Sequence, residues 1–462
     1  MELTHSFQIL VSNFQCVFTT PTFQTFCTLV TGWLLSPQRH RFVTELIQSA
    51  GAVRVGHHSR YHRFFSHAAW SLDHLFRVLT LLLVRCLVPE GVISLAVDDT
   101  LCRKRGLTLH GAGMHYDPLI SSRAKSLVSW GHDWVVVSLI LTFPFWSATK
   151  VWSLPIACRL YRNRQGLTKG KNKGNKKTGA KQTKSKKTAS THRTRPDLAR
   201  ELLEMIASWL PDRQIIVTGD SAYGGRSVLS HLPANMNLIS RVHHKGRLYA
   251  PAPPRQPGQK GRPRVKGELL PDRQAWADDP ELPWKTLKFN QFGLHATVEV
   301  KTRQALYYAS GRSRLLTIVL VRDTLGQRPD QMFYCSDLKL SARQILATYA
   351  GRWSIEVTFE NTKQLLGFED PANRLPQAVQ RTAPLALLLY SLTILWFHVE
   401  GHQHVQFPDR PWYKQKCEPS FADILMTLRR RTWRNILRGL VSTSSLEKWE
   451  LTQITDFLCR VA

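Results

Sequence analysis

The sequence predicts an α/β protein in which a mixed sheet is flanked by helices. Three short apolar runs, at 92–99, 134–145 and 214–220, have the β-branched composition of strands. These runs are continuous rather than alternating, which indicates strands that are covered on both faces. Residues 1–90 instead carry apolar side chains at helical spacing. A chain of 462 residues, 43% of them hydrophobic, is long enough to form several domains and a sizeable core.

The charge balance indicates the kind of partner. Lys plus Arg number 63 against 33 Asp plus Glu, which gives a net charge of +30. Such an excess opposes compaction and favours a polyanion, although a solvated basic surface is the alternative. The longest apolar stretch, 383–397, contains Pro384 and is too short and interrupted for a membrane span, so we expect a buried helix there. We therefore expect nucleic acid as the partner and do not expect a membrane.

Three segments carry the basic excess in different forms. Residues 169–187 hold nine lysines and no acid, a composition that predicts a loop without a core. Residues 251–267 include Gly261-Arg262-Pro263-Arg264, which resembles the AT-hook, an extended arm of the minor groove. A plain Pro/Gly-rich linker is the alternative. The His, Arg and Tyr side chains of 55–65 suit phosphate contacts, and an exposed turn between helices is equally compatible with them.

The most informative segment is 341–366, which is predicted to be one helix. Ser341 is its expected N-cap and Gly367 its stop. Four polar side chains follow at spacings of three, four and seven residues: Tyr349, Arg352, Glu356 and Lys363. At helical geometry these four project within a sector of roughly 60°. Ordinary pairing of residues four apart, worth only about 0.3–0.5 kcal/mol, is the alternative explanation.

Acids at strand ends give this helix a possible chemical role. Asp98 and Asp99 end one predicted strand, and Asp220 ends another. Ligands gather beyond the carboxyl ends of sheet strands, so these acids can converge with Glu356. Two strand-end aspartates and a helix glutamate could hold two Mg²⁺ ions about 3.5–4 Å apart. Each acid alone is also ordinary turn chemistry, so only the combination is specific.

The spacing Tyr349-x2-Arg352-x3-Glu356-x6-Lys363 resembles the Y-R-E-K signature of bacterial insertion-sequence DDE transposases. The segments 96–100 and 218–220 resemble the two aspartate strands of the same catalytic domain, and the order of features matches over roughly 20–400. The resemblance implies a ribonuclease-H-like mixed sheet with flanking helices.

The same resemblance implies a domain layout. Residues 1–90 would form a helical DNA-binding region, 91–400 the catalytic domain and 401–462 a helical C-terminal region. The catalytic domain would be interrupted by a basic loop at about 165–195 and by a β-rich insertion at about 226–335.

It also implies an activity. The enzyme would bind terminal inverted repeats in double-stranded DNA as a homodimer, cut the element free and join its 3′ ends to target DNA. It would act at the nucleoid in the bacterial cytoplasm. Two Mg²⁺ ions, for which Mn²⁺ can substitute, would be held by Asp99, Asp220 and Glu356. A catalytically inactive DNA-binding protein or repressor, and a nuclease on the same fold, are the alternatives.

The individual roles follow from the motif. Asp99 directly precedes a threonine, as the family's acid does, and Asp98 is the alternative because adjacent strand residues point to opposite faces. Glu360 is a less favoured substitute for Glu356. Five residues are expected to bind DNA: Tyr349, Arg352, Lys363, Arg262 and Arg264. Three aromatics of the insertion are loose candidates for holding a flipped base: Phe333, Tyr334 and Trp284.

Overall fold

The computed structural model describes most of the chain. The described residues are 3–36, 41–122, 124–163, 192–255, 260–291, 294–407 and 415–441, together with 453–455 and 458. The lysine-rich run at 169–187 lies outside the described residues.

The described residues contain ten strands in one mixed sheet, which confirms the predicted α/β class. Nine of them follow the order β2-β3-β1-β5-β6-β10-β9-β8-β7, and β4 also pairs with β3. The strands are β1 (Ile93–Arg103), β2 (Gly113–Tyr116), β3 (Val128–Phe143), β4 (Ser147–Tyr161), β5 (Ile215–Gly219), β6 (Met236–Arg241), β7 (Lys285–Gln291), β8 (Leu294–Leu306), β9 (Leu315–Asp323) and β10 (Gln331–Cys335).

Strand direction changes across the sheet. β1 runs antiparallel to β3, and β3 runs antiparallel to β4. β5 is parallel to both β1 and β6, and the connection from β4 to β5 contains helix α7 (Arg195–Trp209). β10 pairs antiparallel with β6, so the strands of the predicted insertion extend this sheet rather than forming a separate one.

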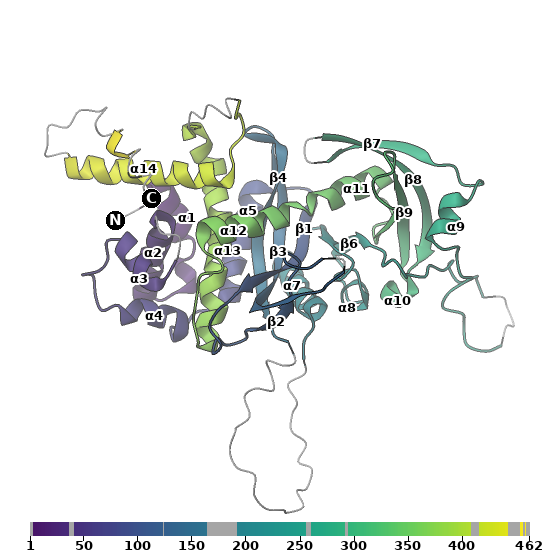
Figure 1. Cartoon of the computed structure of the whole chain (residues 1–462), viewed down its shortest axis with the longest axis horizontal. Coiled ribbons are helices and arrows are strands. Elements are labelled where there is room, and N and C mark those ends of the chain that lie inside the picture. Colours follow the sequence, from purple (N-terminus) through teal and green to yellow (C-terminus); the bar gives the residue numbers. More distant parts are fainter. Residues whose placement is uncertain are drawn as a thin grey trace, which may run out of the picture.

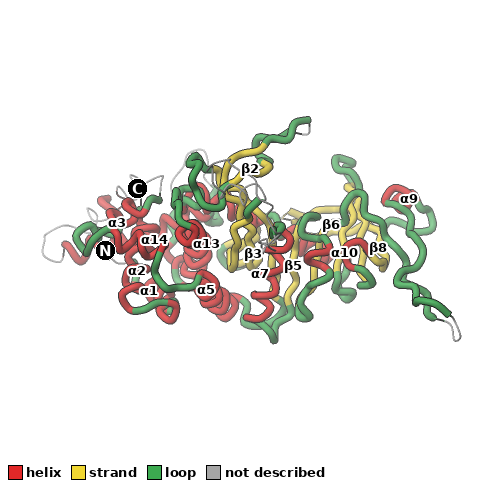
Figure 2. Tube along the Cα trace, turned by 90° about the horizontal axis from the view of Figure 1, so that it is seen from below, coloured by secondary structure: helices red, strands yellow, loops and turns green. Residues whose placement is uncertain are grey.

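Helices gather at one end of the molecule and strands extend to the other (Figure 2). The N-terminal helices and α14 share the helical end, whereas β7, β8 and β9 lie at the opposite end (Figure 1). The remaining helical elements are α1 (His5–Ser12), η1 (Gln15–Val17), α2 (Thr20–Leu35), α3 (Val43–Ser49), α4 (Ser59–Ser66), α5 (Leu72–Leu87), α8 (Arg226–Leu229), α9 (Arg273–Asp278), α10 (Tyr308–Gly311), α11 (Ala342–Gly351), α12 (Ser354–Leu366), α13 (Pro376–Val399), η2 (Gly401–His404) and α14 (Phe421–Val441).

Helix α13 is the predicted buried helix. It is the one described helix that is long and apolar enough to cross a membrane, and 89% of its most apolar window is buried inside the fold. It packs against β4, α4, α5 and α14. An all-round apolar surface is what a helix needs when neighbours cover it on every side.

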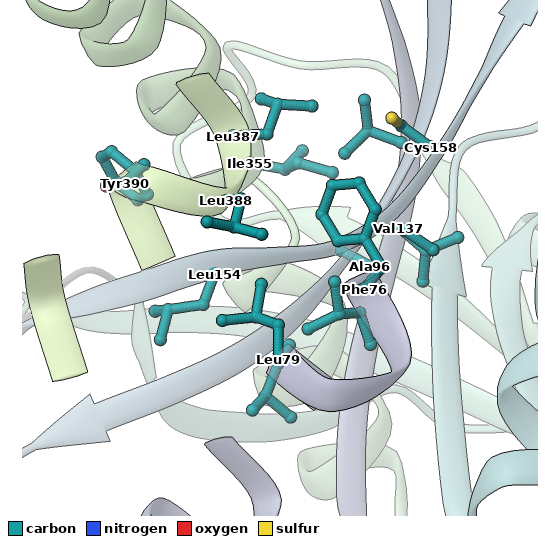
Figure 3. Packing of buried hydrophobic residues seen from close by; sticks show 14 of the residues in the cluster. Phe76, Leu79, Ala96, Val137, Leu154, Cys158, Ile355, Leu387, Leu388 and Tyr390 are labelled. Atoms are coloured by element: carbon teal, nitrogen blue, oxygen red, sulfur yellow. The ribbon is translucent and has the colours of Figure 1, made fainter. Parts of the chain in front are cut away.

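The main core joins the sheet to helices from both ends of the chain. Figure 3 shows side chains from α5, β1, β3, β4, α12 and α13 packed together. Its fully buried members include Phe76, Leu79, Ala96, Val137, Leu154, Ile355, Leu387 and Leu388. Helix α12 is therefore seated on the sheet by the same packing that holds α13.

We expect Leu387→Ala to lower the free energy of unfolding by about 2–5 kcal/mol, because the truncation leaves a cavity in this core. Leu387 has no exposed surface. Urea denaturation followed by circular dichroism measures the change. Val399→Ala, at a side chain that is 54% exposed near the end of the same helix, is the control and should change stability by no more than about 0.5 kcal/mol. Equal effects of the two substitutions would contradict this view of the core.

Candidate active site

The two adjacent aspartates of β1 have different surroundings. Successive strand residues point to opposite faces of a sheet. A guanidinium N–H of Arg352 donates to Asp98 Oδ2 at 2.5 Å. The hydroxyl of Tyr223 donates to Asp99 Oδ1 at 2.5 Å, and Arg195 Nε lies 3.3 Å from Asp99 Oδ2. Asp98 thus faces the helix that carries the signature, whereas Asp99 faces a separate set of partners.

Asp220 lies beside Asp98 because of the pairing of β1 with β5. The two strands are parallel, with Val97 opposite Gly219, so Asp98 and Asp220 are the next residues along each strand. Backbone N–H groups after the strand hold the Asp220 carboxylate: Oδ1 accepts from Ala222 at 2.8 Å and from Tyr223 at 3.3 Å. Asp220 directly follows the carboxyl end of β5, where α/β sheets bind ligands. The prediction that Asp98 and Asp99 end their strand was wrong, because β1 continues to Arg103 through its pairing with β3. Asp98 instead lies where the parallel pairing of β1 with β5 ends.

The predicted single helix over 341–366 is divided in the structure, and that prediction was wrong in this respect. Helix α11 ends at Gly351 and α12 begins at Ser354. Between them the backbone forms tighter bonds, since the N–H of Glu356 donates to the carbonyl of Trp353, three residues earlier, at 3.1 Å. Gly351, the last residue of α11, is the local signal for this break, because glycine is a poor helix former.

Arg352 lies in this turn and contacts two of the three acids. Besides its bond to Asp98, its guanidinium donates to Glu356 Oε1 at 3.1 Å. The Arg352 side chain is 11% exposed, Asp98 17% and Glu356 37%, so the group opens to solvent on the side of Glu356.

Packing and hydrogen bonds fix the helix that carries Glu356. Ile355 and Phe359 are buried, and the Thr358 hydroxyl donates to the carbonyl of Ser153 in β4 at 2.7 Å. At the far end, Gly367 adopts the left-handed conformation that terminates α12. A helix held at its centre and its end keeps Glu356 at a fixed position relative to β1.

Crowding and burial change the acidity of these groups. Burial raises the pKa of Asp98 to about 7; Arg352 opposes the rise, while Asp99 and Asp220 add to it. Burial also raises the pKa of Glu356, against the effect of Arg352, and Asp220 raises it further. The three carboxyl groups therefore repel one another, and positive charge stabilises their ionised forms.

The donor set suits a divalent metal in its chemistry. Carboxylate oxygens from Asp98, Asp220 and Glu356 are the ligands that Mg²⁺ and Mn²⁺ prefer. Among the described residues, no three His, Cys, Asp or Glu side chains lie close enough together to hold a metal ion. The guanidinium of Arg352 contacts both Asp98 and Glu356 and offsets part of their negative charge.

A second polar cluster lies around Asp99. Arg195 bridges Asp99 and Asp133, donating to Asp133 Oδ2 from Nε at 2.6 Å, and Asp133 is only 1% exposed. Tyr223 links this cluster to Asp220, because its hydroxyl bonds Asp99 while its backbone N–H bonds Asp220. Sequence reasoning did not select Tyr223 or Arg195. The position of Tyr223 three residues after Asp220 is the signal that could have drawn attention to it.

The residues predicted to contact phosphate fall into two groups. Tyr349 packs edge to face against Phe333, with ring centroids 4.8 Å apart, and Lys363 donates to the carbonyl of Leu101 at 2.7 Å. Together with Arg352, these residues have partners within the chain. Arg262 and Arg264 are exposed and belong to the loop between β6 and α9, away from α12 (Figure 1).

The other candidates make structural contacts. Tyr334 is fully buried and donates to the carbonyl of Gly224 at 2.7 Å. Phe333 is 7% exposed, and Trp284 lies under the cationic ends of Lys301 and Arg322. Glu360 accepts from Gln364 on an exposed face of α12.

Comparison with known proteins places the chain in a family. A family model described as DDE superfamily endonuclease matches residues 13–310. The chain belongs to this family. The match includes both aspartate strands of the site and ends before Glu356. A solved piggyBac transposase synaptic complex with hairpin DNA is 12% identical, with a TM-score of 0.40, and the alignment covers 99% of this chain and 81% of that one. Curated proteins gave no match.

We expect Asp98 to make the stability of this DDE endonuclease depend on pH. Its folded pKa of about 7 exceeds its ordinary value of 3.8, so the folded chain keeps a proton that the unfolded chain loses between these pH values. The free energy of unfolding therefore receives a contribution that falls as pH rises through this window. Asp98→Asn removes that contribution, so the variant should gain stability relative to the native chain between about pH 4 and about pH 8, measured by urea denaturation.

Asp117→Asn is the control of opposite sign. The bidentate bond from Arg103 lowers the pKa of Asp117 to about 2, so its carboxylate stabilises the fold above its ordinary pKa. This variant should be less stable than the native chain at neutral pH, and the deficit should shrink only in strong acid. If the difference in stability between Asp98→Asn and the native chain does not change with pH, while the difference for Asp117→Asn behaves as expected, then Asp98 does not retain its proton.

Proposed function

We propose that the chain is a DNA transposase that cuts a mobile element at its terminal inverted repeats and joins the 3′ ends to target DNA. One observation carries the proposal. In this member of the DDE endonuclease family, Asp98 of β1 and Asp220, which follows β5, lie next to a helix junction where Arg352 contacts both Asp98 and Glu356. The spacing of the junction residues matches the Y-R-E-K signature of bacterial insertion-sequence transposases.

The strand order supports a ribonuclease-H-like catalytic domain. Within the larger sheet, β4, β3, β1, β5 and β6 stand side by side. β3 runs antiparallel to both β4 and β1, β5 and β6 run parallel to β1, and α7 connects the two halves. This arrangement is the one expected of such a domain, with Asp98 at its central strand.

We assign the three catalytic carboxylates to Asp98, Asp220 and Glu356. The motif register favours Asp99, but the Asp99 carboxylate is engaged by Tyr223 and Arg195 away from the signature helix. Divalent cations held by the three acids, Mg²⁺ with Mn²⁺ as a substitute, would activate the attacking oxygen and offset charge on the leaving oxygen.

The chain's own cations complete the site. Arg352 is positioned to transfer its hydrogen bonds from carboxylates to a phosphate, since a planar guanidinium binds either group in the same bidentate manner. Lys363, in the last turn of α12, pairs with Glu369 at 3.3 Å and can transfer its contact to a phosphate in the same way. With a net charge of +30, the chain would bind double-stranded DNA with a steep dependence on salt. We propose a homodimer on the two element ends, acting at the nucleoid.

Cleavage of labelled DNA that carries the ends of the encoding element tests the proposal. With Mg²⁺ the native chain should nick at the element boundary, and Asp220→Ala should bind the same DNA without cutting it. Target DNA added to the nicked product should become joined to the 3′ end. Nicking without joining would indicate a nuclease on this fold. Binding without nicking by both chains, with Mn²⁺ as well, would indicate an inactive DNA-binding protein.

The adjacent pair Asp98 and Asp99 tests the assignment of the carboxylates. We expect Asp98→Asn to reduce the cleavage rate by about a hundredfold or more, since even misplacement of a catalytic group by about 1 Å can have that effect. Asp99→Asn should retain more activity, because Asp99 contacts the reacting groups only through Tyr223 and Asp220. Both variants remove one charge from neighbouring positions, so each is a control for the other. If Asp99→Asn loses more cleavage activity than Asp98→Asn, the catalytic carboxylate of β1 is Asp99.

A further inference from the structure

A basic segment lies outside the candidate active site, in the loop between β6 and α9. We call residues 251–255 and 260–267 the basic arm. The sequence from 251 to 267 contains five cations, no acid and no aromatic residue. Its cations are Arg255, Lys260, Arg262, Arg264 and Lys266.

The base of the basic arm is fixed to the sheet. The N–H of Gly267 donates to the carbonyl of Ala250 at 2.8 Å, and Tyr249 pairs with Leu306 of β8. The ammonium of Lys266 lies 3.6 Å from the centre of the Tyr249 ring. A Cβ at Gly267 would come within 2.4 Å of the carbonyl oxygen of Pro251, so the two sides of the base approach too closely for a larger residue. The arm therefore leaves the fold in a set direction.

Beyond this base the arm is open. Arg262, Pro263 and Arg264 are exposed, and neither arginine pairs with an acid among the described residues. Gly261 has a φ of +97°, with no atom of the protein within 4 Å of the position of a Cβ, so the backbone turns sharply in free space just before Arg262. Pro263 has a fixed φ and disfavours a helical conformation at Arg262, the residue before it. The structure thus presents two unpaired guanidinium groups on either side of a proline.

These features match one kind of polyanion. The minor groove of A·T-rich DNA is narrow and strongly negative, and it rewards inserted arginines on an extended backbone. Single-stranded nucleic acid is bound chiefly by aromatic stacking, and the arm has no aromatic residue. The minor groove of duplex RNA is wide and shallow, so a narrow arm gains little there.

We propose that the basic arm lies in the minor groove of A·T-rich duplex DNA, with Arg262 and Arg264 inserted. The inference rests on the proposed function only in taking DNA as the partner, since the arm needs no cleavage. It would give the protein a sequence preference from an element far from the carboxylates.

Binding of the full chain to labelled A·T-rich and G·C-rich duplexes, measured by fluorescence anisotropy in EDTA at fixed salt, tests the proposal. The native chain should prefer the A·T-rich duplex by about fivefold or more, the lower end of what one misread base pair costs. Netropsin, which occupies the minor groove, should remove that preference. Equal affinities for the two duplexes would overturn the proposal.

Matched variants locate the preference. Arg262→Ala with Arg264→Ala should bring the affinity ratio close to one. Replacing both arginines with lysine keeps the charge but should also weaken the preference, because lysine is more strongly hydrated and lacks the planar fork. Lys285→Ala with Lys288→Ala removes two exposed charges of β7, outside the arm, and should leave the ratio unchanged. If either arm variant keeps the native preference for the A·T-rich duplex, the proposed insertion of Arg262 and Arg264 is wrong.

The outcome is separable from that of the cleavage test. The A·T preference should persist in Asp220→Ala, because the arm does not include the carboxylates. If the A·T preference persists but the native chain does not cleave DNA, the proposal for the arm stands and the proposed transposase activity is wrong. If the native chain cleaves DNA but has no A·T preference, the proposed transposase activity stands and the arm is a linker.

Discussion

The contact of one guanidinium with two carboxylates holds the candidate site together. Asp98, Asp220 and Glu356 would otherwise face one another as like charges in a partly buried place, and one or more would take up a proton. Arg352 donates to Asp98 and Glu356 at once and thereby joins the central strand to the signature helix. Hydrogen bonds with a charged donor are stronger than neutral ones, so this junction is held in one arrangement.

The backbone brings these distant residues together by a simple route. Parallel pairing sets Asp98 beside Asp220, although 121 residues separate them in the sequence. The segment that follows does not leave the sheet, because β10 returns to pair with β6, next to β5. Helix α11 then crosses back over β5 and β6 towards β1 (Figure 1). The insertion therefore extends the edge of the sheet without disturbing the path to Glu356.

Some of this arrangement was predictable because it depends on local pattern. The β-branched run before Asp98, the apolar run before Asp220 and the stop at Gly367 all form the expected elements. The break between α11 and α12 had one local signal, Gly351, the last residue of α11, because glycine weakens a helix interior. That signal alone does not predict the 3₁₀-type turn that follows it. The roles of Tyr223 and Arg195 also depend on tertiary contacts, because Arg195 meets Asp133 across 62 residues of sequence.

The choice between Asp98 and Asp99 shows the limit most clearly. Either aspartate could be the metal ligand by composition, and alternation requires only that they differ. What separates them is the second acid that the arginine beside each aspartate contacts. Arg195 is shared between Asp99, which is 29% exposed, and the buried Asp133. Arg352 is shared between Asp98 and Glu356, whose side chain is 37% exposed. Solvent exposure does not decide between the two arginines in favour of Arg352, because the Arg195 side chain is 32% exposed and that of Arg352 is 11% exposed. The contact of Arg352 with Glu356 of the signature helix is what groups Asp98, rather than Asp99, with the other two acids.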